Sequence, residues 1–274
     1  MSKQASKSIM MIRPKHFGFD PESAESNAFQ IREGSDKGDE IQQKALDEFD
    51  EAVSSLQRMG VPVVVIEDTE DPVKPNAIFP NNWVSFHEDK VLLYPMMAVN
   101  RRAERRTEIL KTLGQHGIVI EPIIDLSHFE SEGKYLESTG SIIFDYPNKL
   151  AYACKSDRTN SVVLKKACEI LGFEPIIFDS VDKNGESIYH TNVMMCLADK
   201  YVVICLESIP IDQREQVSIA LENTGHEVIE INYDQMYSFS GNMLEVENGE
   251  GHSVLVMSQA ASNSLTHDQK EKLS

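Results

Sequence analysis

The chain has 274 residues, with 26 lysines and arginines against 44 aspartates and glutamates, which gives a formal net charge of −18. Such a polyanion repels phosphate backbones and anionic membrane surfaces, so we expect no nucleic-acid or membrane partner. Apolar residues make up 41% of the chain, which is enough for a sizeable core and excludes global disorder.

The N-terminal sequence and the cysteine pattern do not indicate export or metal binding. Residues 1–8 lack the apolar stretch of a signal peptide, and no apolar run elsewhere is long enough to span a bilayer. There is no C-x-x-C pair, and the cysteines lie within apolar runs, as reduced thiols often do. We therefore expect a cytoplasmic protein without a metal ion, a cofactor or a disulfide. The four cysteines are Cys154, Cys168, Cys196 and Cys205.

The first predicted elements are a strand, a long loop and a helix. The strand is apolar and covers 8–13, and the loop runs from about 14 to 37. Phe17, Phe19 and Phe29 in this loop either cover a pocket or anchor the loop on the core. The helix that follows is amphipathic. Its apolar residues recur every three or four positions, at Ile41, Ala45, Phe49, Val53 and Leu56.

A unit of strand, turn, strand, helix and strand then repeats along the chain. Each helix is closed by a glycine before a β-branched run, as a left-handed C-terminal cap requires. These glycines are Gly60, Gly117, Gly172 and Gly225, spaced by 57, 55 and 53 residues. Alternating runs joined by polar turns predict the hairpins. The hairpins cover 78–94, 141–154, 193–206 and 243–257.

Units of roughly 50 residues cannot bury a sheet alone, so we expect them to stack around a common axis. No flexible linker interrupts the chain, and we predict one propeller-like α/β domain over 1–274. Its first and last units are incomplete in this chain. The strand at 8–13 has no hairpin partner, and a terminal helix near 266–273 is followed by no closing glycine and no strand.

Six short segments, each on the expected element, resemble the pentein fold of guanidino-group-modifying enzymes. They are MIRP at 11–14, FPNNW at 79–83, YP at 94–95 with NRR at 100–102, LESTG at 136–140, SDRT at 156–159 and YHTN at 189–192. Together they are most similar to the citrulline-utilisation hydrolase, or amidinotransferase-like, branch. The resemblance covers nearly the whole chain. It implies five ββαβ units around a pseudo-fivefold axis.

Penteins of this kind attack the central carbon of a guanidino or ureido group with a cysteine thiolate, while a histidine and a carboxylate move protons. By resemblance, His190 is the histidine and Glu137 is the glutamate that orients it. Both residues stand just before the first hairpin strand of their units, where corresponding ends converge on the axis. The alternative is a surface histidine at a strand end and an unrelated exposed glutamate.

Two asparagines indicate the charge of the substrate. Arginine deiminases carry aspartates in Phe-x-x-Asp and His-x-Asp strings, which grip a guanidinium cation. Asn82 and Asn192 stand at both positions here. An amide cannot neutralise a buried cation, but it can bond to a neutral ureido group such as that of citrulline. For Asn82, the alternative is a simple turn residue.

Two arginines are candidates for binding the substrate carboxylate. Arg158 is similar to the family arginine that does so with its planar fork. Its segment also allows a helix start capped by Ser156. Arg101 is a second candidate, although four arginines between 101 and 106 are also typical of a solvated helix face.

No residue of this chain matches the nucleophilic cysteine that the resemblance implies. In the family it lies in a glycine-rich stretch leading to a C-terminal strand, beyond Ser274, and none of the four cysteines matches it. Only Cys154, just before the SDRT segment, is a conceivable substitute.

One hypothesis is a C–N hydrolase that converts citrulline to ornithine, carbon dioxide and ammonia once its C-terminus is complete. The others are a non-catalytic pentein that binds a small amino acid, and an arginine deiminase or dimethylarginine hydrolase. The oligomeric state stays open.

Overall fold

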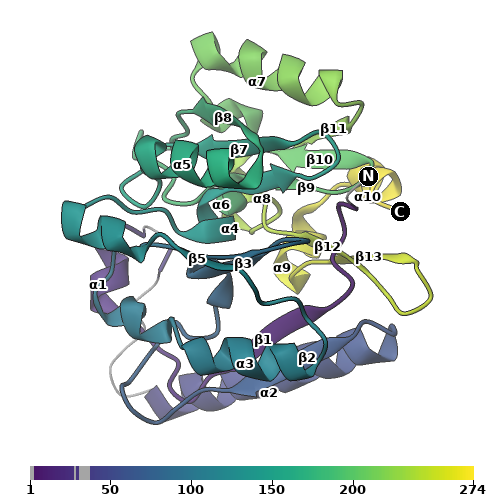
Figure 1. Cartoon of the computed structure of the whole chain (residues 1–274). Coiled ribbons are helices and arrows are strands. Elements are labelled where there is room, and N and C mark those ends of the chain that lie inside the picture. The colour runs from purple at the N-terminus through teal and green to yellow at the C-terminus, as the bar shows by residue number, and fades with distance from the viewer. Residues whose placement is uncertain (1–2, 28, 31–37) are drawn as a thin grey trace.

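The predicted strands and longer helices follow one another in the predicted order, together with short helices that the sequence does not predict. The computed structural model describes residues 3–27, 29–30 and 38–274 (Figure 1). Within them the strands form five small sheets, and no closed sheet joins these into one. The architecture is therefore mixed α/β. None of the helices in the described part of the chain combines the length and apolar character that a membrane crossing requires.

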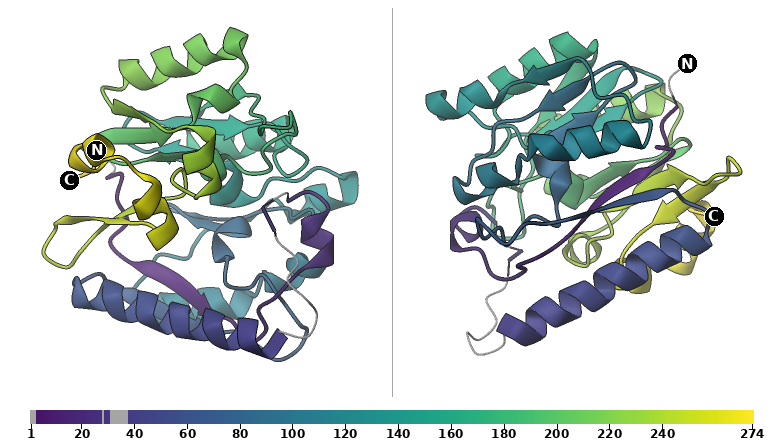
Figure 2. Two further views of the ribbon diagram at one scale, coloured as in Figure 1. Left: turned by 180° about the vertical axis from the view of Figure 1, so that it is seen from behind. Right: turned by 60° about the horizontal axis from the view of Figure 1, so that its bottom comes forward.

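The first sheet consists of two parallel strands joined through a long helix. β1 (Ile9–Arg13) pairs in register with β2 (Val63–Glu67). Between them lie α1 (Pro21–Ala24) and α2 (Gly38–Arg58), and α2 runs along one side of the molecule, below these strands (Figure 2). Strand 8–13 thus finds a parallel partner.

The next three units share the predicted order. In each, an antiparallel hairpin is joined by a parallel third strand, and a helix precedes that strand. The second unit has β3 (Val84–Phe86), β4 (Val91–Leu93), α3 (Thr107–Gln115) and β5 (Ile123–Asp125). The third has β6 (Ile143–Asp145), β7 (Leu150–Cys154), α5 (Ser161–Leu171) and β8 (Glu174–Phe178). The fourth has β9 (Met195–Leu197), β10 (Tyr201–Ile204), α7 (Ile211–Asn223) and β11 (Glu227–Glu230).

The final segment adds one hairpin and three short helices. β12 (Leu244–Glu247) and β13 (Ser253–Val256) are antiparallel, as predicted. α8 (Tyr233–Tyr237) and α9 (Gln259–Ser264) flank them, and α10 (His267–Lys272) is the predicted terminal helix, with a capping box at Thr266. Leu56 and Val61 pack on Val246 and Val254, so the first unit covers this last hairpin.

The first strands of the predicted hairpins are shorter than expected, because short helical turns precede them. These turns are η2 (Pro80–Asn82), α4 (Ser138–Ser141) and α6 (Thr191–Met194), before β3, β6 and β9. Further 3-10 turns are η3 (Asn100–Glu104), η4 (Ser127–Glu132) and η5 (Leu206–Ser208). α4 lies against both η2 and α6. The ends of three units therefore meet.

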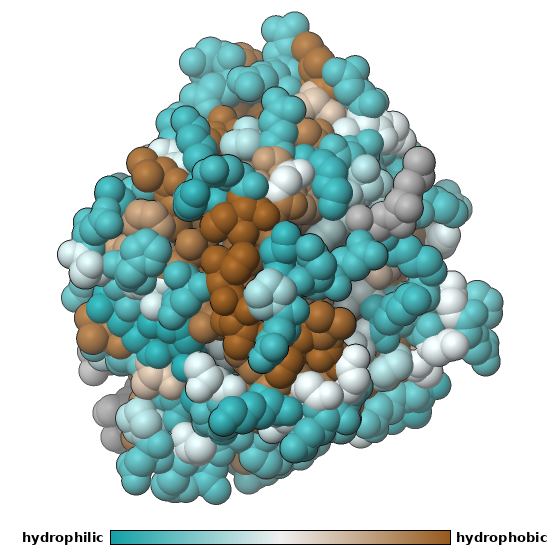
Figure 3. All heavy atoms as spheres, viewed as in Figure 1, coloured by the Kyte–Doolittle hydropathy of each residue, from teal (hydrophilic) through white to brown (hydrophobic). Residues whose placement is uncertain are grey.

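The surface reflects the composition. Hydrophilic side chains cover most of the face seen in Figure 3, in keeping with the charge of −18, while a band of apolar side chains crosses its centre. The interior is apolar in each unit, with Leu92, Ala151 and Val202 fully buried on the middle strands of the three-stranded sheets. Most charged side chains thus lie outside, and each three-stranded sheet contributes its central strand to the core.

Candidate active site

Three helical turns bring together side chains from three separate units. Glu137 and His190 occupy the positions just before α4 and α6, and Asn82 ends η2. Hydrogen bonds hold the turns together, from Thr139 Oγ1 to the carbonyl of Asn81 (3.3 Å) and from Thr191 Oγ1 to the carbonyl of Ser141 (2.7 Å). The predicted convergence of corresponding unit ends is therefore present.

His190 and Glu137 form a buried pair. His190 Nε2 lies 2.8 Å from Glu137 Oε2, and the two residues are 4% and 0% exposed. The second carboxylate oxygen accepts a hydrogen bond from the backbone N–H of Met97 (3.1 Å). The alternative of a surface histidine with an unrelated glutamate is therefore wrong. Their catalytic role stays a prediction.

The charges around this pair decide where its proton lies. Burial alone would raise the pKa of Glu137, but the hydrogen bond from His190 and the nearby Arg158 and Arg101 hold that pKa at about 2. Burial also lowers the pKa of His190 despite its bond to Glu137, so the imidazole is neutral at neutral pH. A neutral ring that donates from Nε2 to an ionised carboxylate keeps a free lone pair on Nδ1. His190 is thus arranged as a base at Nδ1.

Gly140 makes room for the site. A Cβ at this position would stand 2.7 Å from the Asn82 side chain and 2.9 Å from the His190 ring. Both side chains therefore reach the same point beside the Gly140 backbone, and any larger residue would displace them. The LESTG segment contains this glycine, yet its spacing alone assigns it no role. A small residue beside a candidate catalytic glutamate is the signal that could have found it.

The two predicted asparagines differ in their surroundings. Asn82 is buried, at 5% exposed, and its amide contacts the guanidinium of Arg101. It also lies in the turn η2, as the alternative interpretation of Asn82 expects. Asn192 is half-buried on α6, and its backbone carbonyl accepts a hydrogen bond from Asn242 Nδ2 (2.9 Å). Substrate contact by either asparagine stays a prediction.

Arg158 is buried and bonded to the protein itself. Its guanidinium donates to the carbonyl of Ser23 (2.7 Å) and to Ser26 Oγ (2.8 and 2.9 Å), and lies 3.4 Å from Glu137 Oε2. A carboxylate at this fork would share or displace the contacts with residues 23–26. No helix begins at Ser156, as the alternative predicted, because Asn160 caps α5; Ser156 Oγ instead accepts from the Arg158 backbone N–H (3.1 Å) in a turn and donates to the carbonyl of Tyr189 (2.7 Å).

The arginines between 101 and 106 do not form a solvated helix face. Arg101 is only 3% exposed, and its Nε and NH2 each lie 2.9 Å from an oxygen of Glu104. The other three also pair with carboxylates, Arg102 and Arg105 with Glu130 and Arg106 with Asp68. Ion pairing thus draws this basic segment inward. Carboxylate binding by Arg101 stays a prediction.

The sequence of the chain matches a known protein family. The family model described as N,N dimethylarginine dimethylhydrolase, eukaryotic, matches residues 13–274. The chain belongs to this family. The match places it in the pentein superfamily of guanidino-modifying enzymes that its sequence motifs resemble. No curated protein matches the chain significantly.

Solved structures share the fold of this dimethylhydrolase family member at low identity. The N-terminal domain of ArgZ with bound substrate, an arginine dihydrolase of the ornithine-ammonia cycle in Cyanobacteria, has a TM-score of 0.69 at 14% identity, covering 96% of this chain and 86% of that one. Unliganded AgrE also gives 0.69 at 14% identity, over 96% of this chain and 34% of that chain. A dimethylarginine dimethylaminohydrolase in an adduct with S-methyl-L-thiocitrulline gives 0.62 at 14% identity, over 97% and 88%.

The cysteines of this dimethylhydrolase family member are buried free thiols. Burial raises the pKa of Cys154 to about 11, of Cys168 and Cys196 to about 12, and of Cys205 to about 11. Cys154 Sγ lies 3.5 Å from Thr191 Oγ1 and 3.5 Å from the carbonyl of Ile188. A protonated thiol is a poor nucleophile, so these surroundings favour a structural role for all four.

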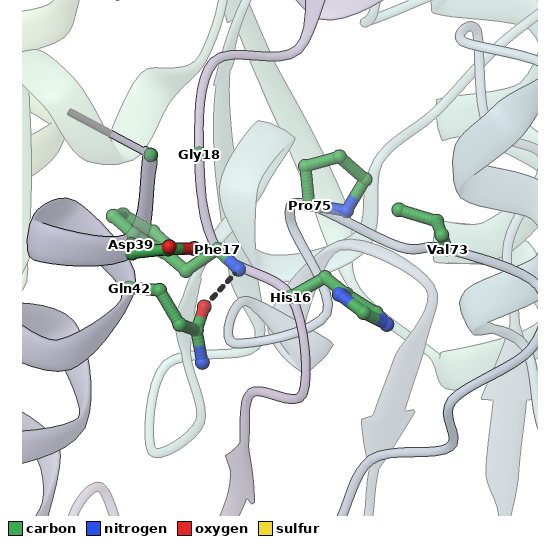
Figure 4. A pocket seen from close by; sticks show the side chains of 8 residues that line it. His16, Phe17, Gly18, Asp39, Gln42, Val73 and Pro75 are labelled. Atoms are coloured by element: carbon green, nitrogen blue, oxygen red, sulfur yellow. Dashed lines mark hydrogen bonds between the residues drawn. The ribbon is translucent and has the colours of Figure 1, made fainter. Parts of the chain in front are cut away.

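A surface hollow of about 280 Å³ lies outside the His190 site (Figure 4). It is lined by the start of the long loop, the start of α2 and the segment around Val73 and Pro75, and Gln42 accepts a hydrogen bond from the Phe17 backbone in its wall. Phe29 instead stacks on Tyr237, with ring centroids 5.1 Å apart. Phe29 therefore anchors its part of the loop. Residues 28 and 31–37 of the loop predicted over 14–37 lie outside the described residues.

We expect the buried Glu137–His190 pair to make the free energy of unfolding fall at acidic pH. A carboxyl whose folded pKa is depressed stabilises the fold above its unfolded pKa of 4.5, and this contribution is lost as the pH falls toward about 2. The loss amounts to roughly 3 kcal/mol at 1.36 kcal/mol per pKa unit. Urea unfolding across this pH range measures it. Glu137→Gln should flatten the curve, and parallel curves for variant and wild type would contradict the assignment.

Proposed function

We propose that this chain is the substrate-binding and proton-transfer part of a pentein hydrolase for a ureido amino acid, citrulline. The five small sheets would be the blades of one domain around a pseudo-fivefold axis. The observation that carries the proposal is the Glu137–His190 pair placed beside the carboxamide of Asn82, with no carboxylate at that position. Free, buried thiols support a reducing compartment such as the cytoplasm.

Charge balance favours a neutral ligand at this site. A guanidinium would need an unpaired anion, but Glu137 already serves His190 and Arg158, and Glu104 is held by Arg101. The amide of Asn82 cannot compensate a buried cation. A ureido group carries no charge and offers both an oxygen acceptor and N–H donors, so it can bond to these groups without such a cost.

The reaction also needs a thiolate, which we place outside these 274 residues because the four cysteines of the chain are buried and protonated. Nδ1 of His190 would take the proton of the cysteine thiol, the resulting thiolate would attack the ureido carbon, and His190 would pass that proton to the departing amino group, which leaves as ammonia. Water would then attack the S-carbamoyl intermediate, giving up its proton to Nδ1 of His190 and releasing the thiolate. The resulting carbamate loses carbon dioxide to leave ornithine.

Ligand binding tests this proposal without turnover. Calorimetry on the 274-residue chain should find citrulline bound at least about tenfold more tightly than arginine or dimethylarginine, a difference of about 1.4 kcal/mol. The family match favours dimethylarginine, and the arginine dihydrolase neighbours favour arginine, as the second candidates. Tighter binding of either ligand would overturn the citrulline assignment and support that candidate.

Turnover separates an enzyme from a binding protein. We expect the 274-residue chain to release no ammonia from citrulline, because proton transfer by His190 cannot replace the covalent step. A longer polypeptide that supplies a cysteine beside His190 should restore the release. Ammonia release by the 274-residue chain that Cys154→Ser abolishes would contradict this prediction and identify Cys154 as the nucleophile.

A further inference from the structure

Arg101 holds the side chain of Asn82 in one orientation. Its guanidinium is itself fixed by Glu104, with two hydrogen bonds of 2.9 Å, and NH2 also approaches the carbonyl of Asn76 (3.5 Å). The amide atom of Asn82 that faces it lies 2.7 Å from NH1 and 3.1 Å from NH2. Arginine can only donate hydrogen bonds, so this amide atom must be the oxygen.

The other end of the same amide must then be its NH2 group. It lies 2.7 Å from the position of a Cβ at residue 140, where the His190 ring also arrives, and 3.2 Å from Nδ2 of Asn81. Nδ1 of His190 stands 2.9 Å from that same point. The site therefore presents an N–H donor from Asn82 next to the lone pair of Nδ1.

We propose that Arg101 is a positioning residue that sets the substrate specificity of this site by fixing the polarity of the Asn82 amide. This inference rests on the proposed function, which it deepens by assigning the group that selects the ligand. A ureido oxygen accepts from the fixed NH2 group, whereas an N–H of a guanidinium would meet another donor. Turning the amide to suit a guanidinium would break both contacts with Arg101.

Arg101 is placed to neutralise the carboxylate that Asn82→Asp would introduce. Asn82→Asp places a carboxylate within reach of both NH1 and NH2 of Arg101, in the bidentate arrangement that arginine favours. The new charge is then neutralised within the protein. We therefore expect Asn82→Asp alone to weaken citrulline binding without a matching gain in arginine binding.

The orientation can be tested without a ligand. In the full chain with labelled asparagine side chains, the NH2 protons of Asn82 should show a nuclear Overhauser effect to the Hα protons of Gly140. In the double variant Arg101→Gln/Glu104→Gln, which removes both charges together, this effect should weaken as the amide turns. An Overhauser effect to the Arg101 guanidinium protons in place of Gly140 would overturn the proposal, whatever the ligand proves to be.

Specificity is tested by the ratio of citrulline to arginine affinity. The ratio should fall by about tenfold in Arg101→Gln/Glu104→Gln, through loss of a charge-assisted bond that orients the amide. The matched control is Arg105→Gln/Glu130→Gln, which removes a bidentate pair (2.9 and 3.2 Å) from the same segment. This control should leave the ratio within about twofold.

The outcomes separate the two proposals. An unchanged ratio in the folded Arg101→Gln/Glu104→Gln variant, or an arginine gain of about tenfold in Asn82→Asp alone, overturns the role of Arg101. If that double variant does not fold, Asn82→Asp and the Overhauser effect in the wild type decide the question. Failure of the wild-type chain to bind citrulline, with the Overhauser effect to Gly140 present, refutes the proposed substrate and leaves the fixed amide intact.

Discussion

Replacing Glu137 by glutamine is expected to lower the free energy of unfolding by about 3 to 5 kcal/mol at neutral pH, because it removes one partner of a buried charge network. Glu137 is 0% exposed and accepts hydrogen bonds from His190, Arg158 and the Met97 backbone. Without its charge, Arg158 and Arg101 remain buried with less compensation. Equilibrium unfolding in urea measures the difference.

A matched control is Glu132→Gln, which removes an exposed carboxylate that pairs with Lys134 at 2.8 Å. Its cost should be much smaller than that of Glu137→Gln, because water screens exposed pairs. Equal costs for the two substitutions would mean that Glu137 contributes no more than a surface charge. The charge network around His190 would then have to be abandoned.

Arg158→Ala is expected to weaken citrulline binding by about 2 kcal/mol, the value of a charge-assisted, bidentate pair with the ligand carboxylate. A citrulline analogue without the carboxylate should bind almost unchanged. Calorimetry with both ligands on one protein preparation isolates the contribution of the ligand carboxylate to the binding free energy. Arg158→Lys, which keeps the charge but loses the fork, should fall between wild type and Arg158→Ala.

Arg158 also contacts the loop near α1, which gives a second explanation for any loss of binding in Arg158→Ala. Its guanidinium donates to the carbonyl of Ser23 in α1 and to the hydroxyl of Ser26, so Arg158→Ala also removes contacts that hold this part of the loop in place. Equal losses for both ligands would indicate that this loop, and not a missing carboxylate contact, weakens binding. Ser26→Ala, which leaves the arginine in place, should then reproduce the loss.

Elements with a strong local signal could be predicted from the sequence. Gly60, Gly117, Gly172 and Gly225 all adopt positive φ, between 71° and 81°, after the helices that they were predicted to close. Glycine has no Cβ that opposes this conformation, so its position alone indicates a helix end. The hairpins follow from alternating apolar residues in the same way. Both signals span only a few neighbouring residues.

The helical turns η2, α4 and α6 could not be predicted, since they are too short to show a period. Ser138 illustrates the cause. It adopts a φ of 43°, and its hydroxyl donates to the carbonyl of Val84 in another unit (2.9 Å). A contact between residues so far apart in the chain stabilises a local conformation that the local sequence does not favour.

The sequence by itself determined the longer helices, the hairpins and the residue types found in the candidate site, because propensity, periodicity and side-chain functional groups are local properties. Only the tertiary structure decided that Glu137 and His190 are buried with Oε2 and Nε2 2.8 Å apart, and that the arginines near 101 turn inward. It also decided the polarity of the Asn82 amide, through the contact with Arg101. Burial and charge pairing depend on which units meet, and that follows from packing of the whole chain.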